Sequence, residues 1–525
     1  MIPVRLPAGR LPPYVIALLA GVAQALSIAA PWNGQPLWWL QLLSLAVLAW
    51  LAQGAGSWRR AGLLGWAFAT AWLAGTFWWL FISMHVYGGL PSPLAVVAVL
   101  TLAALLALYY AAACAVFAAL DRPPALVRAL VFAAAWSLAE LLRVTWFTGF
   151  PWGAGGYAHV DGPLSFLASR IGVHGIGLVA ALLAFTLSML PSSGSLRSWR
   201  YWLAVAGAAG LLAACNIATL PQDDVPATAP RLSVALLQGN IPQDEKFQGG
   251  TGVPMALDWY GRQLQQNTAS LVVAPETAIP MLPRQLPSGY FDALTARFAS
   301  GEQAALLGIP LGSFEQGYTN SVIGLKPDAP VYRFDKHHLV PFGEFVPPLF
   351  KWFTRMMNIP LGDFNRGPLG QRPFEWRGER LAPNICYEDL FGEELGVQFR
   401  EAAQAPTILV NVSNIGWFGN TVAIDQHLQI SRMRSLEFER PMLRATNTGA
   451  TAIIDHRGRV THSLARHSRG VLAGEVEGRS AITPYAWWVS RLGLWPLWLL
   501  GLGILVAATL WHRRLAPFPS GRGQG

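Results

Sequence analysis

The chain has 525 residues, of which 53% are hydrophobic and only 13% carry a formal charge. Because soluble proteins carry charges on about a quarter of their residues, this composition argues against an ordinary soluble protein and favours a membrane protein. The net charge of +9 does not indicate nucleic-acid binding, because many arginines flank apolar runs and no basic stripe interleaved with aromatic residues is present.

Eight apolar runs are long enough to cross a hydrocarbon core about 30 Å thick, which takes about 18 or more residues. In chain order they are 12–31, 36–54, 62–82, 93–119, 124–142, 164–191, 201–220 and 488–511. The stretch between the last two runs has the charges and strand patterns of a soluble domain. We therefore predict a seven-span membrane domain over 1–222, a soluble domain over 230–478, an eighth span over 487–512 and a tail over 513–525.

The arginines predict the orientation of these runs, because short cytoplasmic loops carry an excess of Lys and Arg. If every run crosses once, the loops and tails on one side hold Arg5, Arg10, Arg59, Arg60, Arg122, Arg197, Arg200, Arg513, Arg514 and Arg522. The loops on the other side, such as 31–36 and 85–93, hold no Lys or Arg. Both termini are therefore expected in the cytoplasm, with the soluble domain in the periplasm of a Gram-negative cell.

The soluble segment alternates between strand-like and helix-like patterns. Apolar runs such as Arg231–Asn240, Ser270–Pro280 and Arg380–Asp389 predict strands, whereas Leu390–Ala405 and Ala423–Arg440 have apolar residues at helical spacing. This alternation predicts a layered α/β fold in which helices cover a sheet. Functional residues in such folds tend to lie where strands end and loops begin.

Three predicted strand ends carry chemically useful side chains, namely Glu276, Lys336 and Cys386. Together they supply a base, a group that stabilises an oxyanion, and a nucleophile. Each alone is weak evidence, since a cysteine at a strand end is more often part of the core. However, Cys114 and Cys215 lie in predicted spans and cannot readily pair with Cys386. An unpaired thiol outside the cytoplasm is easier to explain if the protein uses it.

The sequence gives little sign of a metal centre. It contains no CxxC pair, no Cys/His metal-ligand spacing and no GxSxG nucleophile elbow. His337 and His338 are adjacent, so on a strand their side chains would point to opposite faces of the sheet. We therefore expect no metal centre.

Glu140 and Arg143 lie near the outer end of the fifth predicted span. Ionisable groups at membrane depth are costly and often functional, so one interpretation is that they contact the substrate. The other interpretation is a pair one helical turn apart that reaches the membrane interface.

Four motifs in the soluble segment carry a family resemblance: "APETAIP", "DKHHLVPFGEFVP", "ICYED" and "NVSNIGWFG". In this order and spacing they resemble the carbon–nitrogen hydrolase (nitrilase) superfamily. With the eight flanking spans, nearly the whole chain resembles the bacterial apolipoprotein N-acyltransferases. The resemblance implies an α-β-β-α sandwich over about 230–475, joined to a polytopic α-helical membrane domain.

The resemblance also implies roles for individual residues. Glu276, Lys336 and Cys386 match the family's catalytic triad, and Glu344, Tyr387 and Glu388 match residues that support it. Phe247, Asn414 and Trp417 are expected near the substrate. The chain departs from the family pattern at Ile415 and Gly416, where the family usually has Asp-Ala before Trp-Phe-Gly, and this departure puts the lipid contacts of the loop in question.

The activity implied by the resemblance is a two-step acyl transfer in lipoprotein maturation. A phospholipid, expected to be phosphatidylethanolamine, gives a fatty acyl chain to Cys386 as a thioester. The α-amino group of the N-terminal S-diacylglyceryl-cysteine of an apolipoprotein then accepts it. The implied mechanism needs no metal or organic cofactor. The expected location is the bacterial inner membrane, with no nucleic-acid partner.

Two alternatives stay open from the sequence. One is a membrane-anchored amidase or nitrilase that hydrolyses a small C–N bond, although an anchor needs only one span. The other is a transporter or sensor with a non-catalytic external domain. The scarcity of charges within the spans and the intact Glu/Lys/Cys set both argue against that second reading.

Overall fold

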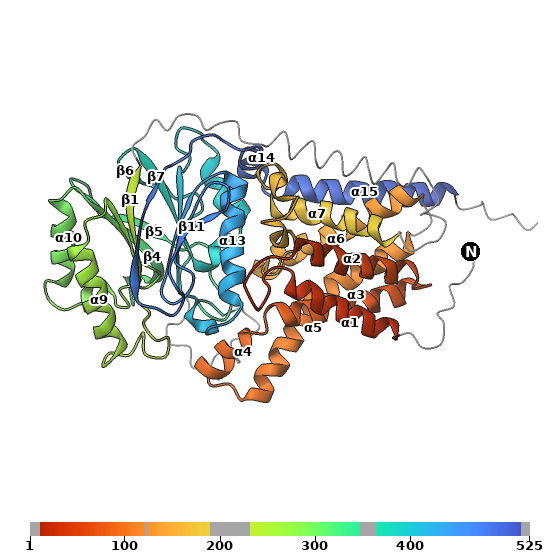
Figure 1. Cartoon of the computed structure of the whole chain (residues 1–525), viewed down its shortest axis with the longest axis horizontal. Coiled ribbons are helices and arrows are strands. Elements are labelled where there is room, and N and C mark those ends of the chain that lie inside the picture. The colour runs from red at the N-terminus through yellow and green to blue at the C-terminus, as the bar shows by residue number, and fades with distance from the viewer. Residues whose placement is uncertain (1–10, 121–123, 190–230, 347–363, 516–525) are drawn as a thin grey trace, which may run out of the picture.

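The computed structural model describes residues 11–120, 124–189, 231–346 and 364–515, which form a helical bundle and a two-sheet sandwich side by side (Figure 1). The helices of the bundle are α1 (Pro13–Leu26), α2 (Trp38–Gln53), α3 (Trp58–Thr76), α5 (Ser92–Ala119), α6 (Ala125–Thr145), α7 (Ala168–Ser188) and α15 (Trp495–Leu515). A short helix, α4 (Leu80–Ile82), and a single π-turn over Ser83–Tyr87 lie between α3 and α5. The predicted seventh span, 201–220, lies outside the described residues.

Within the described residues, three helical segments are long and apolar enough to cross a membrane, namely Ser92–Ala119, Ala125–Thr148 and Ser165–Ser188. Two further candidates are bent pairs: α3 with Leu80–Tyr87 bends by 61°, and α14 (Pro484–Leu492) with α15 bends by 85°. The helices α1 and α2 are apolar but shorter than a full span. The coarser prediction of several membrane-spanning helices therefore holds, whereas the count of eight is not established.

The predicted eighth span, 488–511, is not one straight helix. Its first residues belong to α14, which contacts the bundle helix α7 and the short helix α12 (Gly392–Gly396) of the sandwich. The chain turns at Gly493, which has a φ of +54°, a left-handed conformation that glycine adopts without strain. Hydropathy alone does not reveal such a bend, because both arms are apolar.

The longest helix, α5, is apolar on every side, which is typical of a helix that faces lipid. Its outward side chains include Leu94, Val97 and Leu105, each about half exposed or more. Its inward face packs against α3, where Gly65 allows close approach, since a Cβ at this position would lie only 2.9 Å from the Tyr110 carbonyl oxygen. Small residues at such crossings are characteristic of membrane helix packing.

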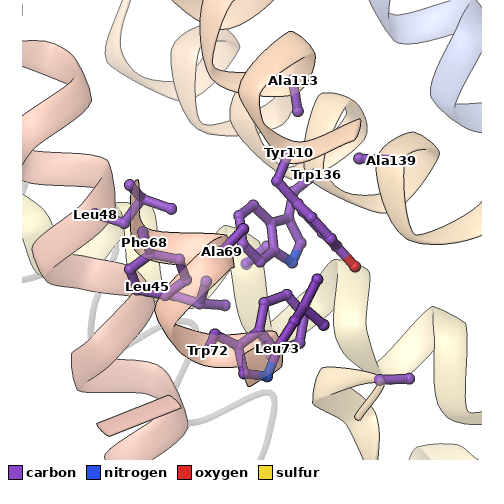
Figure 2. Close-up of a cluster of buried hydrophobic side chains, with 14 of the residues drawn as sticks. Leu45, Leu48, Phe68, Ala69, Trp72, Leu73, Tyr110, Ala113, Trp136 and Ala139 are labelled. Atoms are coloured by element: carbon purple, nitrogen blue, oxygen red, sulfur yellow. The ribbon is translucent and has the colours of Figure 1, made fainter. Parts of the chain in front are cut away.

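Aromatic side chains fill the core of the bundle, as Figure 2 shows for Phe68 and Trp72 of α3, Tyr110 of α5 and Trp136 of α6. The rings of Trp72 and Trp136 stack with centroids 5.8 Å apart, and Tyr110 meets Trp72 edge-on at 5.0 Å. These side chains are almost completely buried. Aromatic pairs at such distances hold the helices in one arrangement.

Within the described residues, the sandwich contains two six-stranded sheets. The first has the order β12-β1-β2-β3-β4-β5 and the second the order β11-β10-β9-β8-β7-β6. The strands are β1 (Leu232–Gln238), β2 (Leu271–Val273), β3 (Ala304–Ser313), β4 (Gly317–Leu325), β5 (Tyr332–Asp335), β6 (Phe374–Trp376), β7 (Glu379–Ile385), β8 (Ile408–Ser413), β9 (Met442–Thr446), β10 (Ala452–Ile454), β11 (Val460–Ser463) and β12 (Gly470–Val476). A buried apolar layer from both sheets lies between them.

Helices cover both outer faces of the sandwich, which gives the expected α-β-β-α arrangement. The helices α9 (Gly252–Gln266) and α10 (Tyr290–Ala299) cover the first sheet. The helix α13 (Ala423–Phe438) covers the second sheet and lies between it and the bundle (Figure 1).

The sequence predicted α13 but also predicted a helix over 390–405, where only the five-residue α12 and short turns form. Gly392 and Gly396 lower helix propensity there.

Candidate active site

The predicted strand ends meet at one edge of the sandwich. Glu276 follows β2 and Lys336 follows β5 in the first sheet, and Cys386 follows β7 in the second. The strand β2 runs parallel to β1 and β3, and β7 runs parallel to β8, so within each sheet the carboxyl ends of these strands lie at one edge. A hydrogen bond from the Asn414 N–H, at the end of β8, to Glu276 joins the two edges. Loops at such strand ends are where layered α/β folds place their chemistry.

A buried cluster of charged side chains surrounds Lys336. Its Nζ lies 3.3 Å from Glu276 Oε1 and 2.9 Å from the Glu344 carboxylate. The Asn320 side-chain amide on β4 donates to both carboxylates at 2.7 Å. Burial alone would lower the pKa of Lys336, but the two carboxylates outweigh it and raise the pKa above its ordinary value. Lys336 is therefore a fixed cation at neutral pH.

Glu276 is held by main-chain contacts as well. Its Oε2 accepts the Asn414 backbone N–H at 2.8 Å, which ties the end of β8 in the second sheet to the first. Gly308 on β3 lets that strand lie directly against the glutamate, since a Cβ there would come within 2.7 Å of the Glu276 Cα. The carboxylate is thus fixed in position before any substrate arrives.

Cys386 begins a tight 3-10 turn, Cys386–Leu390, and adopts a φ of +53°. A left-handed conformation at a non-glycine residue is strained and is often found at functional sites. Burial and then the Glu276 carboxylate raise the pKa of its thiol to about 12, against the lowering effect of Lys336. The sulfur is therefore a thiol at rest, and a base must take its proton before it can act as a nucleophile.

Glu388 connects the Cys386 turn to the loop that carries Lys336. Its Oε2 accepts the Ile385 N–H at 2.7 Å, and its Oε1 accepts the N–H groups of His337 and His338 at 2.7 and 3.2 Å. Burial raises the pKa of Glu388 to about 7, although these three donors favour the charged form. Glu388 therefore holds the two segments together, and its supporting role in catalysis stays a prediction.

Tyr387 connects the turn to the helical bundle. Its hydroxyl donates to the Gly149 carbonyl oxygen at 3.2 Å, and its ring lies 6.4 Å from that of Phe150. Arg143 of α6 fixes the same loop, because its Nη1 donates to the carbonyl oxygens of Phe150 at 2.5 Å and Trp152 at 2.7 Å. The segment directly after Cys386 therefore rests on a loop of the bundle.

Glu140 and Arg143 do not form the helix-end pair that one interpretation expected. Both are almost completely buried, and Glu140 instead contacts His174 Nδ1 at 2.8 Å and accepts the Gly155 N–H at 3.2 Å. The pair interpretation failed because the partner of Glu140 is His174, 34 positions further along the chain, and residue spacing within one helix cannot predict such a contact. A role in substrate binding stays a prediction, and the contacts of Arg143 suggest that such a role acts through the loop.

Sequence reasoning missed Lys246 and Asn320. Lys246 is buried beside the site, and its Nζ donates to the Glu276 main-chain oxygen at 3.0 Å. Burial lowers the pKa of Lys246 to about 7, against the opposing effects of Glu276 and Cys386. The available signals were a lysine next to the aromatic Phe247 and a lone amide within the apolar strand β4.

The residues expected near the substrate have different surroundings, and their role stays a prediction. Phe247 is half buried, with its ring 5.9 Å from Lys246 Nζ. Trp417 is half buried and meets Tyr87 of the bundle edge-on, with ring centroids 5.8 Å apart. The Asn414 side chain donates to Gln243 at 2.9 Å, behind the glutamate.

The two residues that depart from the family pattern are buried. Ile415 belongs to an apolar cluster that includes Tyr387 and Phe391, and its Cγ2 closely approaches Gly449. Gly416 packs next to the Gln243 side chain. The apolar residue at position 415 therefore serves packing between the sandwich and the bundle.

Among the described residues, no group of three or more His, Cys, Asp or Glu side chains is arranged to hold a metal ion. The chemistry available at this edge is instead a thiol, a fixed cation and two carboxylates. This set can form and break an acyl–sulfur bond, with one carboxylate moving the proton.

Comparison with known proteins gives two family matches. Residues 20–186 match the apolipoprotein N-acyltransferase N-terminal domain, and residues 233–483 match the carbon-nitrogen hydrolase family. These boundaries agree with the bundle and the sandwich.

Similar proteins extend over almost the whole chain. An apolipoprotein N-acyltransferase from Verminephrobacter eiseniae is 64% identical over 91% of this chain and 92% of its own length. One from Ralstonia nicotianae is 46% identical over 95% and 94%, and one from Bordetella bronchiseptica is 41% identical over 97% and 100%.

Proposed function

The chain belongs to the apolipoprotein N-acyltransferase family and is an acyltransferase of lipoprotein maturation. We propose that Glu276, Lys336 and Cys386 carry out the acyl transfer. The observation that carries this assignment is the buried Glu276–Lys336–Glu344 cluster, whose charges act on the Cys386 thiol. A carboxylate base and a fixed cation beside a thiol are the parts that acyl transfer through a thioester requires.

In the first step, Glu276 takes the proton of the Cys386 thiol, and the sulfur attacks the ester carbonyl carbon of a phospholipid. A C–S bond forms and the carbonyl oxygen becomes an oxyanion. The Lys336 ammonium and the Tyr387 backbone N–H stabilise this charge. When the ester C–O bond breaks, Glu276 returns its proton to the leaving oxygen, so a lysophospholipid departs and the acyl group stays on Cys386.

In the second step, the α-amino group of an S-diacylglyceryl-cysteine attacks the thioester carbonyl. A C–N bond forms, the C–S bond breaks, and Glu276 transfers the amine proton to the departing sulfur. The product carries an amide-linked third acyl chain, and the thiol is restored. The two substrates thus use one site in turn.

The remaining residues have supporting roles in this proposal. Glu344 balances the charge of Lys336, and Glu388 holds the Cys386 turn against the Lys336 loop. Phe247, next to the buried Lys246, and Trp417, next to Tyr87 of the bundle, are proposed to contact the acyl chains. Phosphatidylethanolamine is the proposed donor, since the reacting ester and a small headgroup can be presented at the membrane surface.

The proposed location is the bacterial inner membrane, crossed by eight spans, with both termini in the cytoplasm and the sandwich in the periplasm. The supports are the arginine pattern of the loops, the apolar helices and the bacterial relatives. A reporter active only in the periplasm, fused after Val476 in one protein and after Gly525 in another, tests this orientation. Activity at Gly525 or its absence at Val476 would contradict it.

The amidase and transporter alternatives are disfavoured by the relatives, which share both the bundle and the sandwich with this chain. No described feature favours either alternative over acyl transfer.

The test of the proposed chemistry is an acyl adduct on Cys386. The purified full-length chain is incubated with phosphatidylethanolamine, and the intact protein is weighed by mass spectrometry before and after hydroxylamine. We expect a mass increase of one acyl chain that hydroxylamine removes, and no increase for Cys386→Ala. An unmodified wild-type chain, or the same adduct on Cys386→Ala, would contradict the mechanism.

A second measurement identifies the acceptor and the donor. A synthetic lipopeptide with an N-terminal S-diacylglyceryl-cysteine is added to the acylated enzyme, and its mass should rise by one acyl chain. The same lipopeptide with a blocked α-amino group is the control and should not change. Phosphatidylglycerol in place of phosphatidylethanolamine tests the headgroup, and equal rates with both would refute a preference for ethanolamine.

A further inference from the structure

A buried polar chain lies beneath the Cys386 turn, and the mechanism above does not use it. His427 of α13 places its Nε2 3.1 Å from the Cys386 carbonyl oxygen. Its other ring nitrogen, Nδ1, lies 2.9 Å from Nη2 of Arg444 on β9. Asp389 lies 3.5 Å from Arg444, so the cation is balanced. These three side chains are completely buried, which makes unpaired groups among them costly.

The contacts define which nitrogen of His427 carries the proton. A guanidinium has donors only, so Nδ1 must accept from Arg444 and therefore carries no hydrogen. The proton is then on Nε2, which donates to the Cys386 carbonyl oxygen. Burial and the neighbouring Arg444 hold the pKa of His427 well below its usual range, and the more distant Lys336 acts in the same direction. The ring is a neutral, permanent donor.

The Cys386 carbonyl and the Tyr387 N–H belong to the same peptide group. A trans peptide is planar, and its C=O and N–H point in opposite directions. A donor that fixes the Cys386 carbonyl on one side therefore fixes the direction of the Tyr387 N–H on the other. The Asn411 side-chain amide also reaches this carbonyl, but only at 3.4 Å, so the His427 contact is the shorter of the two.

The ring of His427 is also held from the bundle side. Trp152 packs on it with ring centroids 5.5 Å apart, and the same Trp152 donates through its indole N–H to Gln426 at 2.8 Å. Gln426 further accepts the Trp79 indole N–H at 3.0 Å and donates to the Thr76 carbonyl at 2.9 Å. His427 is therefore fixed between the bundle and the nucleophile turn.

From these contacts we infer that His427 is a positioning residue which, by holding the Cys386 carbonyl, aims the Tyr387 N–H at the oxyanion formed during acyl transfer. The inference rests on the proposed function of Cys386. It assigns to a neutral histidine a geometric role, in which the ring neither touches the substrate nor moves a proton.

Two variants test the contacts of the two ring nitrogens of His427 separately. The amide nitrogen of a glutamine reaches about as far as Nε2, so His427→Gln keeps a donor for the Cys386 carbonyl. An asparagine is shorter and places its oxygen near Nδ1, so His427→Asn keeps an acceptor for Arg444 but leaves the carbonyl without that donor. The two variants have similar polarity, which makes them a matched pair.

The measurement is the rate of thioester formation by each full-length variant at saturating phosphatidylethanolamine, together with the KM for the phospholipid. We expect His427→Asn to be at least tenfold slower than wild type with the KM changed less than twofold. The reason is that this variant loses stabilisation of the oxyanion but not binding of the phospholipid. We expect His427→Gln to retain at least a third of the wild-type rate.

A third variant controls for a loosened helix. Gln429→Ala removes the contact from α13 to the Gly34 carbonyl, 2.8 Å long, which faces the bundle and not the nucleophile. It should lower the melting temperature but leave the rate of thioester formation within threefold of wild type. A rate loss in Gln429→Ala equal to that in His427→Asn would overturn the inference, because the defect would then belong to the helix as a whole.

The remaining outcomes also decide the question. Equal rates for His427→Asn and His427→Gln, whether both fast or both slow, would overturn the inference. If His427→Asn does not fold, His427→Gln alone decides it, and a folded but tenfold slower His427→Gln counts against the inference. Absence of a thioester in the wild type would instead refute the proposed function, and the inference would fail with it.

Discussion

The two sheets of the sandwich build the proposed active site in different ways. The first sheet supplies a charged half, in which Glu276, Lys336, Glu344 and Asn320 are fixed by contacts between their side chains. The second sheet supplies the half that holds Cys386, called the nucleophile half here, in which the main chain at Cys386 is fixed by two side chains, that of Glu388 within the turn and that of His427 on α13.

This difference predicts how substitutions in each half affect stability and rate. In the charged half, loss of one partner leaves another buried charge uncompensated, so a substitution there affects stability and rate together. In the nucleophile half, a neutral side chain such as that of His427 holds the turn through its main chain, so its substitution removes no buried charge and can change the rate with little change in stability. The following substitutions test that contrast.

The largest effect is expected from Glu276→Gln, which removes the proton acceptor. A general base contributes about 10²–10⁴-fold to a rate, so thioester formation should slow by about 10³-fold. Asp335→Asn is the matched control, because this carboxylate precedes Lys336 but bonds to Ser321 and Arg333, outside the cluster. It should stay within threefold of wild type. A loss below tenfold in Glu276→Gln would show that another group is the base.

Lys336→Met should slow thioester formation by several hundredfold, because one oxyanion donor is worth about 10²–10³-fold. It should also lower the free energy of unfolding by about 3–5 kcal/mol, since two buried carboxylates lose their cation. The double variant Lys336→Met/Glu344→Gln removes one of those carboxylates. It should recover part of the melting temperature but none of the rate, and recovery of both would mean that Lys336 has only a structural role.

The pH dependence of Cys386 alkylation should show how the charged half acts on the nucleophile. With the pKa of the thiol raised to about 12, the thiolate fraction rises with pH throughout the accessible range. The iodoacetamide rate should therefore increase about 100-fold between pH 7 and pH 9, tenfold per unit, without a plateau. In Glu276→Gln the carboxylate that raises this pKa is gone, so the profile should move to lower pH while acyl transfer slows.

A plateau of the wild-type alkylation profile near pH 8.5, the pKa of an ordinary thiol, would contradict this arrangement. An unchanged profile in Glu276→Gln would show that the carboxylate does not act on the sulfur.

Lys246→Met tests the smaller contribution of a lysine that holds the Glu276 main chain. Loss of this single buried contact should slow thioester formation by about tenfold, because the base is then less well positioned. Lys326→Met is the control, since this exposed lysine also donates to a main-chain oxygen, that of Glu375 at 2.7 Å. Equal rates of thioester formation in the two variants would show that Lys246 does not contribute to the site.

Tyr387→Phe should have the smallest effect. It removes only the hydroxyl contact to Gly149 and leaves the backbone N–H of residue 387 in place. We expect a loss of about 1 kcal/mol in stability and a rate within threefold of wild type. A rate loss above 30-fold would show that the hydroxyl itself takes part in catalysis.

The charged half could be predicted from the sequence further than the nucleophile half. Strand ends carrying Glu276 and Lys336 stand out because strands are short apolar runs, and the charges directly follow them. His427 and Arg444 could not be predicted in the same way. They lie 41 and 58 positions after Cys386, on a helix and inside a strand, and only the fold brings them to its carbonyl and to each other.

The bundle shows a similar limit. Hydropathy predicted the apolar segments, and the described helices coincide with them, but it could not predict the bends of 61° and 85° that divide two of the segments. A bend depends on local backbone geometry, such as the positive φ at Gly493, and on the packing of each arm. Apolar content is the same on both sides of the bend.

The place of α13 between the sandwich and the bundle limits how the enzyme can be divided. One face of this helix covers the second sheet, while Gln426 and Gln429 on the other are buried by the bundle. A fragment starting at residue 231, without the bundle, would expose that face and leave the ring of His427 without Trp152. The catalytic domain is therefore not a separable module, and a soluble version would need a redesigned α13 surface before it could keep its nucleophile in place.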